Sequence, residues 1–373
     1  MRKGVTIVAS LFCLFFLLLA VGGMQAEAAP AGDWEAKWKD LVEKAQKEGT
    51  VSIYCANVPV SARVAVQQAF KKKFGINVEY TPTAGGEIVQ KFTTEHQAGL
   101  HLVDVMHTGN TQFTNSIGPM SVTVPLEPLL VLPEVVDQAK WRGGKLPFVD
   151  KDKHAFMVVL LANNFYIINP DLVKDDEIKS TLDILNPKWK GKIVLQDPGV
   201  AGNGNDWFTF TLTNILGMER GEKFMRDFTK QDPTIVRDNR LLAEGVARGK
   251  YPVGIGCSVS QVVDFIKTGA RLAFAKVNQP RLLTPGAGVI FTFKQVPHPH
   301  AAKLFINWFL SREGSSLYAP AHGYPSLRVD VPTQDFIPAL IPGPNDILPT
   351  EEYTLKKGEL MKLGGAIFGG LKK

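Results

Sequence analysis

The amino-acid sequence predicts an α/β protein built as two lobes, and three observations support this fold class. Short apolar strands, polar loops and helical segments alternate three times between residues 50 and 112. A second alternating series occupies residues 193–277. Between the two, residues 155–169 form a long extended run interrupted by Asn163-Asn164, as expected of a strand that leaves one sheet and enters another. Such alternation favours largely parallel sheets, and 373 residues suffice for two cores.

The N-terminus has the pattern of a secretory signal peptide. Arg2 and Lys3 precede an apolar run over residues 5–21, and an Ala-x-Ala step ends at Ala28. We therefore expect residues 1–28 to be removed by cleavage near Ala28, which places the rest of the chain in the periplasm. The alternative is an uncleaved membrane anchor, because a run of this length could just span a bilayer.

The composition is that of an ordinary globular protein with a mild basic excess. Hydrophobic residues make up 45% of the chain and charged residues 21%, and the formal net charge is +6. The basic residues are spread along the chain, so we expect no nucleic-acid partner. The motifs G-x-S-x-G, G-x-x-x-x-G-K-[ST] and H-E-x-x-H do not occur, so we expect neither enzyme activity nor a cofactor.

Three strand–loop–helix units are predicted in the first half, after a helix over residues 35–48. Strands are predicted at residues 51–55, 77–80 and 102–106, and helices up to Phe74 and over residues 87–98. Ligands of open α/β sheets bind beyond the carboxyl ends of the strands. We therefore expect ligand contacts from the loops that follow these strands, at Asn57, Ser61, Thr83, Gly85, Gly86, Thr108, Asn110 and Thr111.

A glycine-rich turn is the central feature of the second half. Residues 199–206 lead from a strand at 193–195 into a predicted helix that begins at Trp207. Such a turn exposes backbone N–H groups and the positive end of the helix dipole, which favours an anionic ligand. Most turns of this kind bind nothing, so this interpretation depends on the rest of the chain.

The following segments complete the second lobe. Strands are predicted at residues 234–237, 252–256 and 273–277, and helices over residues 219–229, from Asp238 onward, and over residues 261–267. Arg240 is the candidate for bidentate binding of an anion, the alternative being a surface ion pair with Asp238 or Glu244. Tyr251 could line the cleft or belong to the core. The expected second-lobe contacts are Gly202, Asn203, Gly204, Arg240, Tyr251, Ser258 and Ser260.

We expect the second lobe to be inserted into the first, with crossings near residues 162–165 and 277–284. A helix over residues 301–310 and a Pro-rich stretch over 325–349 follow, and a basic amphipathic helix from about Glu351 closes the chain. The predicted division is a signal peptide at 1–28, lobe 1 at 29–162 and 280–325, lobe 2 at 163–279, and a C-terminal helical tail at 326–373 that caps the lobes.

Two cysteines follow the signal peptide, Cys55 and Cys257. An even pair in an exported protein could form a disulfide. The two lie in different strand-like runs, one in each half, and a crosslink would lock halves that have to move. Free, buried thiols are therefore the favoured interpretation.

The chain resembles the solute-binding proteins of ATP-binding-cassette importers, in the iron(III)-type branch. The matching segments are KEGTVSIY, FKKKFGINVEY, LVDVM, FYIINPDLV, LNPKWKGKIVLQDP, VARGKYPVGIG and HPHAAKLFINWFLSREG. The resemblance implies the type 2 periplasmic-binding-protein fold, with two lobes hinged by two crossing strands and a ligand cleft between them. It also implies closure on a small-molecule solute and delivery to a membrane permease and its ATPase subunits, without chemistry on the solute. We expect a monomer.

One feature of that branch is absent. Its metal-binding members carry two adjacent tyrosines at positions that correspond here to Val259 and Ser260, and often a His in the first cleft loop, where residues 56–58 have none. Phenolate oxygens are suited to the hard Fe3+ ion. We therefore expect no metal site but a small polar, anionic organic solute. The alternatives are a metal-binding importer subunit, with Glu87, His107 and Asp238 as nearby ligands, and a receptor for a membrane sensor.

Overall fold

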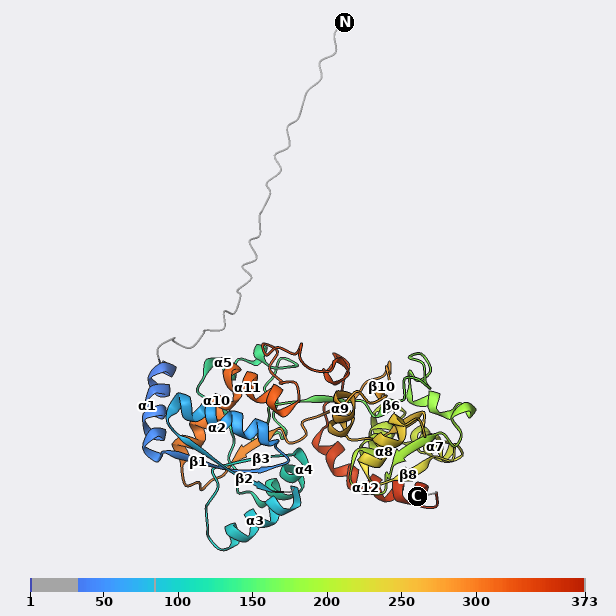
Figure 1. Ribbon diagram of the computed structural model, residues 1–373. Coiled ribbons are helices and arrows are strands. Elements are labelled where there is room, and N and C mark those ends of the chain that lie inside the picture. Colours follow the sequence, from blue (N-terminus) through green and yellow to red (C-terminus); the bar gives the residue numbers. More distant parts are fainter. Residues whose placement is uncertain (2–32, 84, 372–373) are drawn as a thin grey trace.

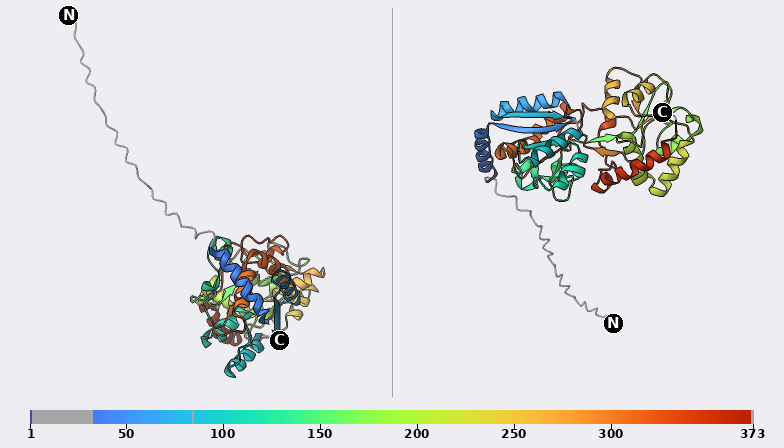
Figure 2. Two further views of the ribbon diagram at one scale, coloured as in Figure 1. Left: turned by 90° about the vertical axis from the view of Figure 1, so that its left-hand side faces the viewer. Right: turned by 90° about the horizontal axis from the view of Figure 1, so that it is seen from below.

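The computed structural model describes Met1, residues 33–83 and residues 85–371. The predicted signal peptide, apart from Met1, lies outside the described residues. The chain forms two lobes that lie side by side (Figure 1), and they are also distinct bodies when seen from below (Figure 2). Each lobe contains a five-stranded sheet, and a two-stranded sheet connects them. This confirms the predicted two-lobed α/β fold.

The first-lobe sheet has the strand order β2-β1-β3-β12-β4. β1 pairs in parallel with β2 and β3, whereas β12 runs antiparallel to β3 and β4. The carboxyl ends of β1, β2 and β3 therefore lie at one edge of the sheet, and the predicted first-lobe loops follow them. The strands are β1 (Thr50–Ala56), β2 (Asn77–Thr83), β3 (Val105–Thr108), β4 (Phe156–Met157) and β12 (Val289–Thr292).

Helices cover both faces of this sheet. The face that carries Cys55 and its register partner His107 is covered by α2 (Val60–Phe74) and α11 (Arg312–His322). The opposite face is covered by α3 (Gly85–Gln97), where Tyr54 Oη donates to Glu95 Oε2 at 2.9 Å. Two further helices, α1 (Asp33–Glu48) and α10 (Pro299–Leu310), pack against each other.

The second-lobe sheet has the order β10-β6-β9-β7-β8. β7 is parallel to β8 and β9, and β6 is antiparallel to β9 and β10. Its elements are β6 (Tyr166–Ile168), β7 (Ile193–Gln196), β8 (Thr234–Val236), β9 (Val253–Ile255), β10 (Ala273–Phe274), α6 (Asn203–Phe210), α7 (Met218–Thr229), α8 (Asn239–Ala247) and α9 (Val259–Lys267). The glycine-rich segment follows β7 at the carboxyl edge of the sheet, but α6 begins at Asn203 and not at Trp207, so the last four residues of the predicted turn belong to the helix.

Two strands connect the lobes. β5 (Leu161–Asn163) pairs antiparallel with β11 (Leu282–Thr284). The extended run after residue 155 thus supplies β4 to the first sheet, β5 to the connection and β6 to the second sheet. This confirms the prediction of a strand that leaves one sheet and enters another.

The C-terminal segment is a further connection between the lobes. Ile347 forms a bridge to Leu282 of β11, and α12 (Glu351–Phe368) then packs on α6 and α7 (Figure 1). Phe368 is buried there against Phe208 and Phe228. The chain was predicted to end in a capping helix, and α12 rests mainly on the second lobe.

Two elements were not predicted. β12 lies between β3 and β4 in the first sheet, in a segment between the second crossing and the helix over residues 301–310 for which no strand was predicted. α11 contains Pro320, a residue that normally disfavours helix interiors. Residues 118–149 contain four short helical segments, η2 (Gly118–Met120), η3 (Glu127–Leu129), α5 (Pro133–Val136) and η4 (Gln138–Lys140).

Cys55 and Cys257 are free, buried thiols in different lobes, as predicted. Burial disfavours the thiolate and raises the pKa of Cys55 to about 11 and that of Cys257 to about 12. Over the described residues, the structure contains no helix with the length and apolar character needed to cross a membrane.

Candidate functional site

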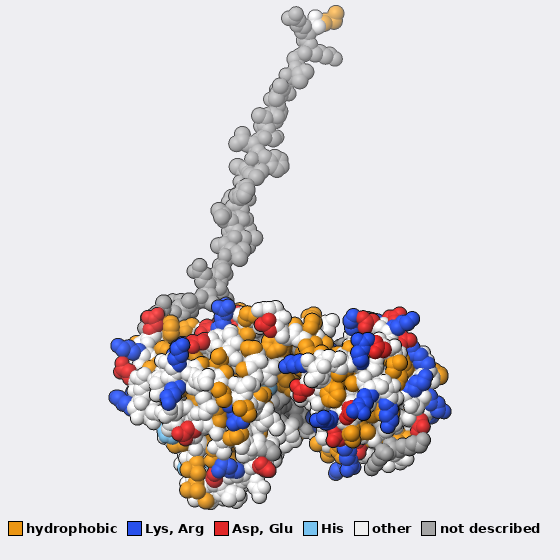
Figure 3. All heavy atoms as spheres, viewed as in Figure 1, with side chains coloured by type: hydrophobic (Ala, Val, Ile, Leu, Met, Phe, Trp, Pro, Cys, Tyr) orange, Lys and Arg blue, Asp and Glu red, His pale blue; other side chains and the backbone are white. Residues whose placement is uncertain are grey.

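A cavity of about 210 Å³ lies between the two lobes and the connecting strands. A hollow separates the lobes in the space-filling view (Figure 3). Parts of the chain that are distant in sequence line the cavity together: Asn57 and residues 109–112 from the first lobe, residues 282–287 from the connection, Asp206 from the second lobe, and Pro349, Tyr353, Thr354 and Lys357 from the C-terminal segment. The interlobe cavity is therefore the candidate binding site.

The loop after β1 and the loop after β3 meet at the first-lobe wall of this cavity. Asn57 adopts the left-handed conformation, with φ of 60°, immediately after β1. A Cβ built on Gly85 would lie 2.8 Å from Gln112 Nε2 and 3.8 Å from Asn57 Nδ2, which places these three residues together. Asn110 Nδ2 lies 3.3 Å from Thr354 Oγ1 of α12, so the C-terminal helix contacts the first lobe here. Thr111 also lines the cavity.

The other predicted first-lobe residues have different surroundings. Ser61 Oγ donates to the carbonyl of Ala321 at 2.9 Å, so its hydroxyl joins α2 to α11. The hydroxyls of Thr83 and Thr108 are buried and have no hydrogen-bond partner among the described residues. Gly86 is exposed in the first turn of α3.

The predicted second-lobe loops are held together by side-chain amides at the carboxyl edge of the sheet. Gln196 Oε1 accepts from the N–H of Gly204 at 2.6 Å, and Gln196 Nε2 lies 3.3 Å from Asn239 Oδ1. Asn239 Oδ1 in turn accepts from the N–H of Ser258 at 2.8 Å, and Asn203 Nδ2 donates to the carbonyl of Cys257 at 3.1 Å. This network holds the loops of Gly202–Gly204, Arg240 and Ser258–Ser260 together.

Replacing Gly204 by alanine is expected to lower the free energy of unfolding by about 1–3 kcal/mol. A Cβ at Gly204 would overlap the backbone carbonyl of Gln196, so the turn would have to shift and weaken its bond to Gln196. Urea denaturation measures the effect. The matched control is Gly86→Ala, because nothing lies within 4 Å of a Cβ built there. Equal stability of the two variants would contradict this close packing of Gly204.

None of the predicted second-lobe contacts is among the residues that line the cavity, and two of them, Arg240 and Tyr251, also lie outside the network of side-chain amides. Arg240 is exposed, does not line the cavity, and its guanidinium has no recorded partner among the described residues. The alternative ion pairs are not formed, because Glu244 pairs with Arg248 and Asp238 caps α8 by accepting from backbone N–H groups. Tyr251 precedes β9, at the end opposite to the carboxyl edge, where it packs against Gly245.

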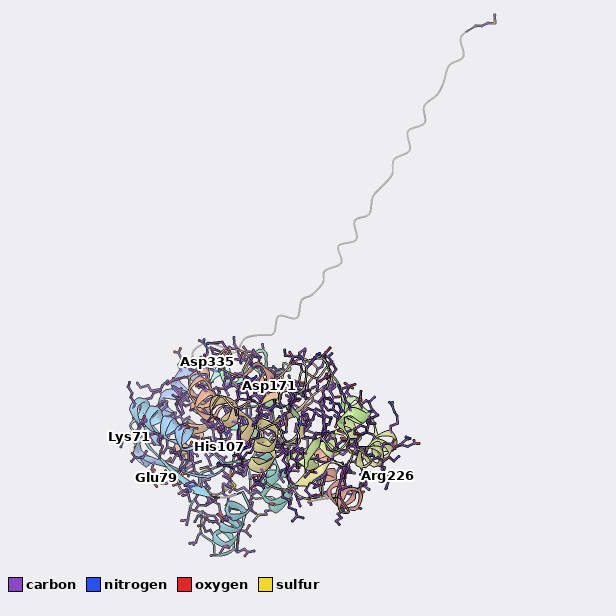
Figure 4. All side chains as sticks on the ribbon, turned by 45° about the vertical axis from the view of Figure 1, so that its right-hand side comes forward. Lys71, Glu79, His107, Asp171, Arg226 and Asp335 are labelled. Carbon is purple, nitrogen blue, oxygen red and sulfur yellow. The ribbon has the colours of Figure 1, made fainter. Side chains whose placement is uncertain are left out.

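The three residues proposed as alternative metal ligands do not form one group. Asp238 is engaged as the cap of α8, and Glu87 is exposed in the first turn of α3 in the first lobe. His107 is buried inside the first lobe, whereas Lys71 and Glu79 lie at its periphery (Figure 4). His107 Nε2 is 3.0 Å from Tyr318 Oη, and burial lowers the pKa of His107 to about 3. Over residues 33–83 and 85–371, no cluster of three or more His, Cys, Asp or Glu residues could hold a metal ion.

Sequence reasoning missed the contribution of α12. Tyr353 Oη donates to the carbonyl of Asp206 at 3.2 Å, and Lys357 forms an ion pair with the Asp206 carboxylate. Burial, together with the Asp206 charge, holds the pKa of Tyr353 well above its ordinary value. Nothing local in the sequence of the tail indicates these contacts, because they depend on where α12 docks.

A family model described as bacterial extracellular solute-binding protein matches residues 56–315. No curated protein sequence matches the chain.

Solved structures share the fold at low sequence identity. The structure of IdiA (FutA) from Trichodesmium, in complex with iron and citrate, is 17% identical, with a TM-score of 0.70 over 87% of this chain and 100% of that chain. Iron-bound HitA from Pseudomonas aeruginosa is 18% identical, with a TM-score of 0.62 over 86% and 99%. AfuA from Actinobacillus pleuropneumoniae, with fructose-6-phosphate bound, is 17% identical, with a TM-score of 0.60 over 85% and 98%.

Proposed function

The chain belongs to the bacterial extracellular solute-binding proteins, and on this premise we propose that it captures a small polar organic solute that carries an anionic group. The two lobes close over the solute in the periplasm, and the protein, as a monomer, delivers it to the permease and ATPase subunits of an ATP-binding-cassette importer. Closure requires that the solute bind the closed state more tightly, through contacts with both lobes.

The polar lining of the interlobe cavity carries this proposal. Asn57, Asn110 and Thr111 offer amide and hydroxyl groups from the first lobe, and the ion pair of Lys357 with Asp206 adds charged hydrogen-bonding groups. Groups of this kind can form hydrogen bonds with the polar groups of an organic solute that has left water. Burying those polar groups without a hydrogen-bond partner would cost several kcal/mol.

A ferric ion held together with an organic acid is the second candidate. It is favoured by the fold shared with IdiA (FutA), whose structure contains iron and citrate. Among the described residues that line the cavity, Tyr353 is the single tyrosine, and its hydroxyl donates to the carbonyl of Asp206, whereas the tyrosine pair that holds Fe3+ in the iron-binding branch is absent. The AfuA structure, with fructose-6-phosphate, is an example of the same fold with an anionic organic solute. These features support the organic solute over direct coordination of iron.

Thermal unfolding of the chain without residues 1–28 tests the proposal. The panel contains Fe3+ alone, Fe3+ with citrate, citrate, inorganic phosphate, sugar phosphates, phosphonates, sulfonates, polyamines and neutral sugars. A ligand at about 100 times its dissociation constant adds about 2.7 kcal/mol to the free energy of unfolding, which raises the melting temperature. A shift with an organic anion alone is expected. A shift only with Fe3+ would favour the metal-binding alternative, and a shift only with a neutral sugar would contradict the anionic solute.

Import and signalling use the same closure and need a separate test. Reconstituted importer subunits should hydrolyse ATP faster when the solute-loaded protein is added. If the loaded protein instead stimulates a membrane sensor and leaves ATP hydrolysis unchanged, the chain is a receptor.

A further inference from the structure

A cluster of polar side chains lies under the first-lobe side of the cleft, between the sheet and helices α2 and α11. We name it the first-lobe recess and define it by Arg63, Tyr80, His322 and Tyr324. The hydrogen bond from Ser61 to Ala321 joins the first turn of α2, which carries Arg63, to the last turn of α11, which carries His322. The rings of His322 and Tyr324 lie 4.6 Å apart.

Tyr80 forms the floor of the recess. It pairs with Ile53 across β1 and β2, so its side chain lies on the same face of the sheet as Cys55, the face that α2 and α11 cover. Tyr318 of α11 packs against His322 at 5.1 Å between ring centroids and closes the inner side.

Several polar atoms of the first-lobe recess are buried without a hydrogen-bond partner. In the described part of the chain these include Arg63 Nε, Tyr80 Oη and both ring nitrogens of His322, a residue that is only 9% exposed. Buried polar atoms in native proteins are nearly always paired, and each unpaired one costs about 1–3 kcal/mol. Their concentration at one place indicates a partner that the protein chain itself does not supply.

The chemistry of these groups favours an oxyanion as the ligand of the first-lobe recess. Arg63 carries a positive charge, and the structure records no ion pair for it within residues 33–83 and 85–371. Burial raises the pKa of Tyr80, which therefore remains a hydroxyl donor. Burial lowers the pKa of His322 to about 4, so near neutral pH the ring offers one N–H. Three donors and one positive charge match the oxygen atoms of a phosphate or carboxylate group.

We infer that the first-lobe recess binds the oxyanionic group, phosphate or carboxylate, of the transported solute; this rests on the proposed function. The recess adjoins the interlobe cavity, because a Cβ built on Gly286, which lines the cavity, would lie 2.5 Å from Cε2 of Tyr324. Arg63 also stands on the first turn of α2, just after the cleft loop of Asn57. The cation that binds the oxyanion is thus Arg63 of the first lobe and not Arg240 of the second lobe.

Isothermal titration with inorganic phosphate and with citrate tests the inference. The variants are Arg63→Gln, which removes the charge, Arg63→Lys, which keeps the charge but loses the planar fork, and Tyr80→Phe, which removes one hydroxyl. Arg240→Gln is the matched control, because it also removes a guanidinium without a recorded partner. Thermal unfolding without ligand shows whether each variant folds.

At least one of the two oxyanions should bind the unmodified chain, and the one that binds distinguishes a phosphate subsite from a carboxylate subsite. Arg63→Gln should weaken binding by about tenfold or more, since a hydrogen bond to a charged group is lost. Arg63→Lys and Tyr80→Phe should weaken it less, and Arg240→Gln should change it less than about twofold.

Two results would overturn the inference in different ways. Unchanged affinity in folded Arg63→Gln and Tyr80→Phe, with weakened binding in Arg240→Gln, would place the anion on the second lobe and leave the proposed function intact. Failure of both oxyanions to bind the unmodified chain at millimolar concentration would overturn the recess and, with it, the anionic part of the proposed function.

Discussion

Replacing Arg328 by methionine is expected to lower the free energy of unfolding by about 3 kcal/mol or more. The Arg328 side chain is fully buried and holds three separate segments together. Its guanidinium donates to Glu134 Oε2 at 3.0 Å, to Asp330 Oδ2 at 2.9 Å and to the carbonyl of Leu310 at 3.1 Å. It also lies 5.3 Å from the centre of the Trp141 ring.

The loss of unfolding free energy in Arg328→Met should lie at the lower end of the range that is typical of broken buried ion pairs. The side chains of Glu134 and Asp330 are 42% and 25% exposed, so their carboxylates can regain water, whereas the carbonyl of Leu310 stays buried without its donor.

Urea denaturation of Arg328→Met and Arg271→Met measures this difference. Arg271 pairs with Asp171 on the surface, and such exposed pairs contribute about 0–1 kcal/mol. Similar losses in the two variants would show that Arg328 does not hold the segments together.

Acidification from pH 6.5 to pH 4.5 is expected to destabilise the protein through two buried histidines. An unfolded histidine titrates at about pH 6.5. In the folded chain, burial lowers the pKa of His322 to about 4 and that of His107 to about 3, the latter with a contribution from His322. As the pH falls below 6.5, the unfolded chain binds protons that the folded chain does not. The stability that the neutral rings provide is therefore present above pH 6.5 and is lost towards their folded pKa values.

For His322 alone the loss of unfolding free energy between these two pH values is about 2 kcal/mol. Urea denaturation of the unmodified chain and of His322→Gln at pH 6.5 and 4.5 isolates this contribution, because other acid-titrating groups are common to both. The variant should lose less stability on acidification. An identical pH dependence in the two proteins would show that His322 is not held neutral in the folded state.

The fold could be predicted to a large extent because its signals are local. Alternating strands and helices, and the extended run from residue 155 to residue 169, correspond to β1–β3 and to β4, β5 and β6. β12 could not be recognised, because its partners β3 and β4 are distant in sequence. No helix was predicted over the residues of α11, which contains Pro320.

The position of the candidate site could be predicted in part. Asn57 and Asn110 line the interlobe cavity, and Gly202–Gly204 lie at the carboxyl edge of the second sheet without lining the cavity. These loops could be placed because the carboxyl edge of a parallel sheet follows from the strand order. Tyr251 precedes its strand, so the same rule would have placed it at the opposite edge. Arg63 belongs to no recognisable motif in the sequence. Only the buried polar atoms without partners in the first-lobe recess make it a candidate for binding an oxyanion. Tyr353 and Lys357 required the docking of α12.

Small-angle X-ray scattering measures most directly whether the solute is held by closure of the two lobes. The radius of gyration of the chain without residues 1–28 is compared with and without the compound that most raises the unfolding temperature, at a saturating concentration. The proposed function predicts a smaller radius of gyration in the bound protein, because the lobes approach across the interlobe cavity. An unchanged radius with a compound that stabilises the protein would mean that binding occurs without closure, which would contradict the proposed mechanism.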